Sequence, residues 1–263
     1  MTKTIPKPKP VSIEALWQST STSDRYFNPA LLTQLPTTAR RYLEHAIAPD
    51  TPLASAVRLW MHGDIKLGEK WRSFRGEEVI CWHRGMIWRA TTWMQGLPIW
   101  GADRIVDGVG DMEWKILGLF PVMKAAGEDV TRSGVGRLQG EAVWLPSVLC
   151  QPDIVWAELN ASQVQASFTT LGEPAHLTLT VSEAGTLECA KFQRWGNPEG
   201  AAYHYEDFGV QVEESGMFEG YTIPKRIRAG WFFGCDSPQG TLCDRFESKG
   251  EFFRCTIDQA IYR

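Results

Sequence analysis

Apolar and polar residues begin to alternate strictly near residue 55, and the alternation occupies most of the chain that follows. In the first run the apolar residues share one parity and the polar residues the other, which is typical of a half-buried β-strand. Similar runs follow at 70–82, 86–94, 98–106 and 111–117, with hairpin turns predicted between them at 83–86 and 107–110. The residues expected on the buried face of the first strand are Val57, Leu59, Met61, Ile65 and Leu67.

Helical spacing of apolar residues interrupts this alternation twice. Residues 37–47 place their apolar side chains on one side of a helix, and Pro49 follows its end. A second helical segment at about 134–150 contains Pro146, which breaks the helix or starts a second short one. Strands resume afterwards, to roughly ten to twelve in all, without the regular strand–helix alternation of a parallel sheet. The pattern therefore predicts an antiparallel sheet with helical inserts.

Charge and hydropathy exclude some partners. The 263 residues contain 27 Lys and Arg against 31 Asp and Glu, a net charge of -4, and nucleic-acid binding needs a concentrated positive surface. We therefore expect no nucleic-acid partner. No run reaches the roughly 18 apolar residues of a transmembrane segment, and the start of the chain lacks the apolar core of a signal peptide. These features predict a cytoplasmic protein.

The six cysteines show no spacing typical of a metal site, and no histidine lies at metal-ligand spacing to them. We expect no metal and no cofactor. Cys235 and Cys243 flank a turn-like segment and are placed to pair across a hairpin, whereas a cytosolic chain favours two reduced thiols. The sequence leaves this pairing open.

Carboxylates gather around one predicted hairpin. Paired carboxylates near a cation are suited to acid–base chemistry, because unlike environments separate their pKa values. The residues are Asp103, Asp107, Asp111 and Glu113. The turn position of Asp107 and the outward parity of Asp111 and Glu113 favour an ordinary structural role for these three.

Arg137 and Glu141 lie four residues apart in the second helical segment, and Trp144 follows Glu141 by three residues. They form either an ordinary helix contact or a charged pair at the mouth of a cavity that orients a ligand head group. Two more of the twelve tryptophans stand out as candidates to line a cleft. Trp60 falls on the polar face of its strand, and Trp100 precedes the charged hairpin.

A series of segments resembles an uncharacterised bacterial family, the domain of unknown function numbered six-five-four-four. It covers roughly residues 36–263 and consists of RRYLEHAI, HGDIKLGEKW, WRATTW, DRIVDGVGDMEWKILGLFPVM, GEAVWLPSVL and YTIPKRIRAGW. This resemblance implies no catalytic residue. The order of the first strands also resembles the bacterial lipoprotein-carrier half-barrels, whose curved sheet holds acyl chains against helices and which work outside the cytoplasm. This second likeness is one of fold.

Together these observations predict a mainly β (α+β) fold, an antiparallel open half-barrel or incomplete barrel whose concave side is covered by the two helices. Residues 1–35 are expected to form a weakly structured arm and 36–263 a single domain. The leading functional hypothesis is binding of an apolar or amphipathic, lipid-like small molecule in a Trp-lined cavity. Its expected ligand-binding residues are Arg137, Glu141, Trp144, Trp60 and Trp100. The alternatives are an enzyme using Glu141 as acid or base, assisted by Asp107 or Arg137, and a protein-interaction module; no catalytic residue and no oligomeric state are predicted.

Overall fold

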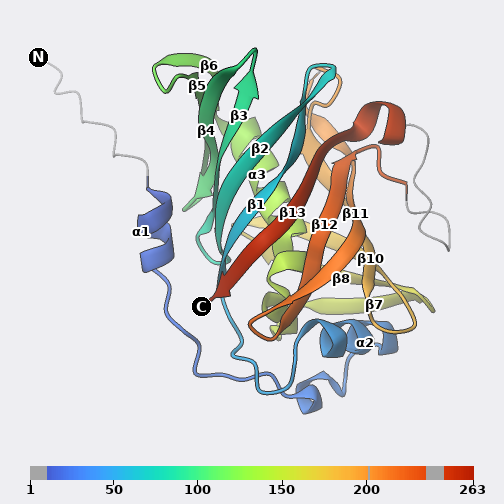
Figure 1. Cartoon of the computed structure of the whole chain (residues 1–263). Helices are drawn as coiled ribbons and strands as arrows, with labels where there is room; N and C mark the ends of the chain where they lie inside the picture. Colours follow the sequence, from blue (N-terminus) through green and yellow to red (C-terminus); the bar gives the residue numbers. More distant parts are fainter. Residues whose placement is uncertain (1–10, 201, 235–245) are drawn as a thin grey trace, which may run out of the picture.

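The computed structural model describes residues 11–200, 202–234 and 246–263, and within them it forms one antiparallel sheet of thirteen strands (Figure 1). The strand order is β6-β5-β4-β3-β2-β1-β13-β12-β11-β10-β9-β8-β7. Strands β1 and β13 pair at the centre, while β6 and β7 lie at opposite edges, so the sheet is an open half-barrel. The predicted fold class is confirmed. Cys235 and Cys243 lie outside the described residues.

The first half of the sheet is a meander in which each strand pairs with the next. Its strands are β1 (Ala56–Leu67), β2 (Lys70–Cys81), β3 (Gly85–Met94), β4 (Leu97–Val106), β5 (Val109–Ile116) and β6 (Phe120–Ala126). The β4–β5 turn uses positive φ at Asp107 (51°) and Gly108 (79°), as a two-residue hairpin of matching twist requires. The strands and turns expected between 55 and 117 are therefore present.

The second half is also antiparallel throughout. Its strands are β7 (Val155–Asn160), β8 (Gln163–Thr170), β9 (Glu173–Val181), β10 (Leu187–Gly196), β11 (His204–Phe218), β12 (Tyr221–Trp231) and β13 (Glu251–Tyr262). A short π-helical turn, Phe246–Gly250, precedes β13. In the described residues the total is one strand above the expected range.

The chain between the two edge strands crosses the concave side of the sheet (Figure 1). It forms helix α3 (Glu128–Gly140) and two 3-10 helices, η2 (Glu141–Trp144) and η3 (Pro146–Cys150). The helical segment expected at about 134–150 is present but begins earlier: the α-helix runs from Glu128 to Gly140, and 3-10 helices follow it to Cys150. Pro146 starts η3, where its missing N–H leaves no hydrogen bond unmade. Residues 120–126, where the alternation predicted no strand, form the edge strand β6.

The other helices lie at the margins of the sheet. Helix α2 (Thr37–Ala46) fits the predicted helix at 37–47 and buries Tyr42 and Leu43. Helix α1 (Ile13–Gln18) and the 3-10 helix Pro29–Leu32 fall in the expected N-terminal arm. The buried Trp17 of α1 packs in a cluster with Val79 and Ile87, whose parity is opposite to that of the main core, so α1 covers the convex face. No helix among the described residues is long and apolar enough to cross a membrane.

The parity predicted for β1 holds through the core. Val57, Leu59 and Met61 are buried on the concave side, whereas Trp60, on the other parity, is half-buried. Ile65 and Leu67 are only partly buried, because the strand runs past the core towards the end of the sheet. The concave face therefore has a fully buried region and a more open one.

Candidate functional site

A cavity of about 290 Å³ lies between the helical insert and the concave face of the sheet. It follows α3 and η2, and its lining becomes more buried along this path. Val130 and Ser133 near the start of α3 are partly exposed, while Val143 and Trp144 of η2 are buried. The cavity therefore has an open end near the start of α3 and a closed end at η2.

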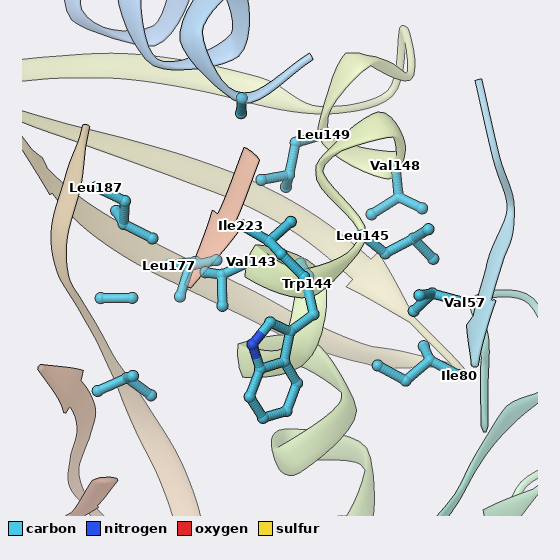
Figure 2. Close-up of a cluster of buried hydrophobic side chains, with 14 of the residues drawn as sticks. Val57, Ile80, Val143, Trp144, Leu145, Val148, Leu149, Leu177, Leu187 and Ile223 are labelled. Carbon is cyan, nitrogen blue, oxygen red and sulfur yellow. The ribbon is translucent and has the colours of Figure 1, made fainter. Parts of the chain in front are cut away.

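Trp144 forms the wall at the closed end. Its indole Nε1 donates a hydrogen bond to the Pro224 carbonyl oxygen at 3.0 Å, which fixes the ring beside β12. Figure 2 shows it among apolar residues of the insert, with Val57 and Ile80 from the first half of the sheet on one side and Leu177 and Leu187 from the second half on the other. The insert thus joins both halves of the sheet through apolar contacts.

Aromatic rings line the cavity on both sides of the insert. The Trp88 ring of the first half lies 5.9 Å from the Phe253 ring of β13, measured between centroids. In the second half, Phe192 and Phe208 lie 5.5 Å apart in the same way. Such rings bring large apolar area with little conformational freedom to lose, which suits a site for an apolar molecule.

Arg137 carries the main ionic cluster of the cavity. Its Nε donates to Glu141 Oε1 at 2.6 Å, its Nη2 to Glu78 Oε1 at 2.7 Å, and its Nη1 to Asp103 Oδ2 at 3.3 Å. The guanidinium carbon lies 5.1 Å from the Trp88 ring centroid. One guanidinium therefore links α3 and η2 to two strands of the sheet.

The carboxyl group of Glu78 is fully buried within this cluster. Burial, and then the neighbouring Glu141 carboxylate, raise the pKa of Glu78 well above its usual value despite the attraction of Arg137. Burial lowers the pKa of Arg137, but the surrounding carboxyl groups overcome this and raise it. Glu78 is thus the neutral member, and Arg137 stays charged beside Asp103 and Glu141.

A second arginine, Arg194 of β10, lines the same cavity. Its Nε donates to the Ser133 carbonyl oxygen at 3.3 Å, and its guanidinium carbon lies 4.7 Å from the Phe208 ring centroid and 5.2 Å from that of Trp231. Burial, and then the positive charge of Arg137, lower the pKa of Arg194 to about 10, so it is charged at neutral pH. No carboxylate of the described chain is within ion-pair distance of it.

The structure brings together three of the five ligand-binding residues expected from the sequence: Arg137, Glu141 and Trp144 all line the cavity. Trp60 does not; it lies in a depression with Trp93 on the opposite face, beneath Arg58. Trp100 is 48% exposed and also lies outside the cavity. Asp107, which was predicted to assist Glu141, lies in the β4–β5 turn and pairs with Arg84 of the β2–β3 turn. It is not among the residues lining the cavity.

Three charged residues of the site were not predicted from the sequence: Glu78, Arg104 and Arg194. Glu78 shares the parity of the buried Ile80 and Trp82, and Arg194 shares that of Phe192. The sequence pattern that could have identified Glu78 and Arg194 is a charged residue at the same strand parity as buried apolar residues. Charged residues are almost never buried without a partner or a function.

The fold and the cavity define an open antiparallel half-barrel with a helix across its concave side and an internal, mostly apolar site. By sequence the chain belongs to a family of unknown function, DUF6920, whose model matches residues 33–262. The expected membership of a family of unknown function is thus confirmed over nearly the same residues, under the number 6920 in place of six-five-four-four. No curated protein matches the chain in sequence.

Three solved structures are similar at low identity. A LolA superfamily protein from Nitrosomonas europaea is 10% identical with a TM-score of 0.42, covering 86% of this chain and 92% of its own. A domain assigned to outer membrane lipoprotein sorting, from Vibrio parahaemolyticus, is 8% identical with a TM-score of 0.39, covering 80% and 86%. A DUF1329 family protein from Desulfovibrio piger has the same identity, TM-score and coverages as the Vibrio domain. The expected likeness to lipoprotein carriers is found at the level of fold, and these identities transfer no function.

The prediction of a cytoplasmic protein is contradicted. It rested on the absence of a signal-peptide pattern, whereas a structure similar to this chain is assigned to the sorting of outer membrane lipoproteins. We withdraw the cytoplasmic assignment and put no other compartment in its place.

Proposed function

We propose that this protein binds an apolar or amphipathic small molecule in the cavity between α3 and the sheet. The observation that carries the proposal is the lining itself: aromatic and aliphatic side chains with a few charged groups among them. Binding sites for small molecules have this composition, because apolar area supplies affinity and a few polar groups fix orientation.

The size of the cavity limits the ligand. Its volume of about 290 Å³ lies at the lower end of the range for small-molecule sites, about 300–1,000 Å³. If a methylene group takes about the volume of a water molecule in the liquid, about 30 Å³, the cavity holds a chain of on the order of ten carbon atoms. A single medium-length chain therefore suits it better than a molecule with several long chains.

The test uses a neutral apolar fluorophore, N-phenyl-1-naphthylamine, and a substitution that closes the open end. Val130 lines the cavity near the start of α3 and is partly exposed, so Val130→Trp narrows the opening without disturbing the buried core. We expect the affinity for the fluorophore to fall at least about tenfold, with the free energy of unfolding changed by less than about 1 kcal/mol. Fluorescence titration and urea unfolding measure the two quantities.

Val109→Trp is the matched control, because Val109 is 66% exposed at the start of β5 and lies outside the cavity. We expect it to leave the affinity within about twofold of wild type. Equal affinities for wild type and both variants would contradict the proposal and place the fluorophore on the surface, where Phe120 and Val122 of β6 are exposed.

The alternative of acid–base catalysis by Glu141 stays a prediction. Arg137 lies beside Glu141, as that alternative requires, and Glu78 supplies a neutral carboxyl group next to it. Two neighbouring carboxyl groups, one of them with a raised pKa, resemble the arrangement of acid–base pairs in enzymes. The same cluster also fastens the insert to the sheet, so no reaction is proposed from it.

A further inference from the structure

The cavity contains three arginines, and they differ in their partners. Arg137 faces three carboxyl groups, and Arg104 pairs with Asp111, its Nε donating to Oδ1 at 3.0 Å. Arg194 has one hydrogen bond to a carbonyl oxygen and contacts with two aromatic rings, but no carboxylate partner in the described parts of the chain. Among the described residues that line the cavity it is the arginine without an ion pair, and the Glu141 and Asp103 carboxyl groups act on it only from beyond ion-pair distance.

A cation held in a mostly apolar cavity without an anion is costly, because burial removes water without supplying a compensating charge. The aromatic faces of Phe208 and Trp231 offset part of this cost through cation–π attraction. Neither ring supplies an oxygen acceptor, so the guanidinium N–H groups are left for other acceptors. The Ser133 carbonyl oxygen accepts a hydrogen bond from one of the five N–H donors of Arg194.

The backbone around Arg194 is shaped to admit its side chain. Gly136 of α3 faces it, and a Cβ atom there would lie 3.1 Å from the Arg194 Cγ, a tight contact. The absence of a side chain at this position lets the arginine lie against the helix. Ser133 and Gly136 belong to the part of α3 nearer the open end, so Arg194 is separated from Trp144 by about two to three helical turns.

We propose that Arg194 binds the anionic oxygen head group, a carboxylate or a phosphate monoester, of an amphipathic ligand whose apolar chain extends towards Trp144. The inference rests on the proposed function and adds the charge and the orientation of the ligand. A planar guanidinium donates two parallel hydrogen bonds to either group, which gives both affinity and direction. The aromatic rings on both sides of the insert then contact the chain.

The experiment compares decanoate, decyl phosphate and uncharged decanol, each below its micelle concentration, by displacement of N-phenyl-1-naphthylamine. For Arg194→Gln we expect the affinity for the preferred anion to fall about tenfold or more, because hydrogen bonds to charged groups are strong, while decanol stays within about twofold. Arg194→Lys keeps the charge without the planar fork and should restore part of the affinity. The tighter of the two anions identifies the head group.

Arg132→Gln is the matched control. Arg132 also lies over two aromatic rings, those of Trp195 and Tyr205, and forms an ion pair with Glu173, but it is outside the cavity. We expect it to change the affinity for neither anion. Unfolding midpoints of all variants confirm that the folded proteins are compared.

The outcomes separate the two proposals. Failure of decanol and both anions to displace the fluorophore from wild type would overturn the proposed function together with this inference. If decanol displaces the fluorophore from wild type, the proposed function stands. If Arg194→Gln then lowers the affinities for decanol and for the anions equally, or lowers neither, the role of Arg194 alone is overturned. Selective loss of the anions in Arg194→Gln but not in Arg132→Gln supports it.

Discussion

Arg137 of α3 and Arg194 of β10 line one cavity, but their surroundings differ. Carboxyl groups hold the first, and aromatic rings hold the second. Arg137 donates to Glu78, Asp103 and Glu141, whereas Arg194 contacts Phe208 and Trp231. The same side chain thus serves two purposes. A neutralised guanidinium fastens the insert to the sheet, and an unneutralised one is free to bind an anion.

The comparison also explains why the cavity tolerates so many charges. Asp103 and Glu141 pair with Arg137, Asp111 pairs with Arg104, and the raised pKa of Glu78 favours its neutral form. Glu78, Asp103 and Glu141 accept hydrogen bonds from Arg137, whereas Arg194 donates, among the described residues, only to the Ser133 carbonyl oxygen. An anionic ligand would therefore meet the arginine that has no carboxylate, and its apolar part the aromatic walls.

The largest expected effect comes from removing the neutralised arginine. Arg137→Met leaves the buried carboxyl group of Glu141 and the partly exposed one of Asp103 without their cation, and breaking a buried cluster costs about 3–5 kcal/mol of unfolding free energy. Arg194→Gln should cost less than about 1 kcal/mol, because it strands no carboxylate and ends the burial of an unpaired charge. Urea unfolding followed by circular dichroism measures both.

Adding Glu141→Gln to Arg137→Met is the control for this mechanism. It removes one of the stranded charges, so part of the lost stability should return. Equal destabilisation by Arg137→Met and Arg194→Gln would remove the distinction between the two arginines.

A smaller effect is expected from Glu78→Gln, which imitates the neutral carboxyl group. The pKa of Glu78 is raised in the folded protein, so its contribution to stability is complete below its unfolded pKa of about 4.3 and is lost as the pH rises towards the folded pKa. Across that interval the wild type should lose up to about 1.4 kcal/mol per pH unit relative to Glu78→Gln.

Glu69→Gln, at an exposed position between β1 and β2, is the control for the change of residue type. Unfolding free energies measured from pH 4 to pH 8 should run parallel for Glu69→Gln and wild type. Parallel curves for Glu78→Gln and wild type would mean that Glu78 is ionised in the folded protein, and the charge balance of the cavity would have to be revised.

Local pattern was enough to predict the first half of the sheet. The strands from Ala56 to Ile116 alternate cleanly and are joined by short turns with glycine, so parity and turn chemistry agree. Local pattern does not predict strand β11, because its pairing with β12 shifts register around Glu214, which breaks the alternation. Strand β6 was missed because its apolar residues are exposed at an edge, where parity carries no burial signal.

The candidate site was predictable only within the insert. Arg137, Glu141 and Trp144 are close in sequence, so helical spacing was enough to group them. Their partners Glu78 and Asp103 come from distant strands, and Arg194 comes from the other half of the sheet. Trp60 and Trp100 were grouped with the site for their residue type, but both have the parity opposite to the buried concave-face residues of their strands, such as Leu59 and Ile105.

The most direct test of the account is a crystal structure of the protein with decanoate. The account predicts the alkyl chain between the insert and the sheet, reaching towards Trp144, with carboxylate oxygens about 2.7–3.2 Å from the Arg194 guanidinium nitrogens. An empty cavity, or decanoate in the cavity with its carboxylate away from Arg194, would contradict it.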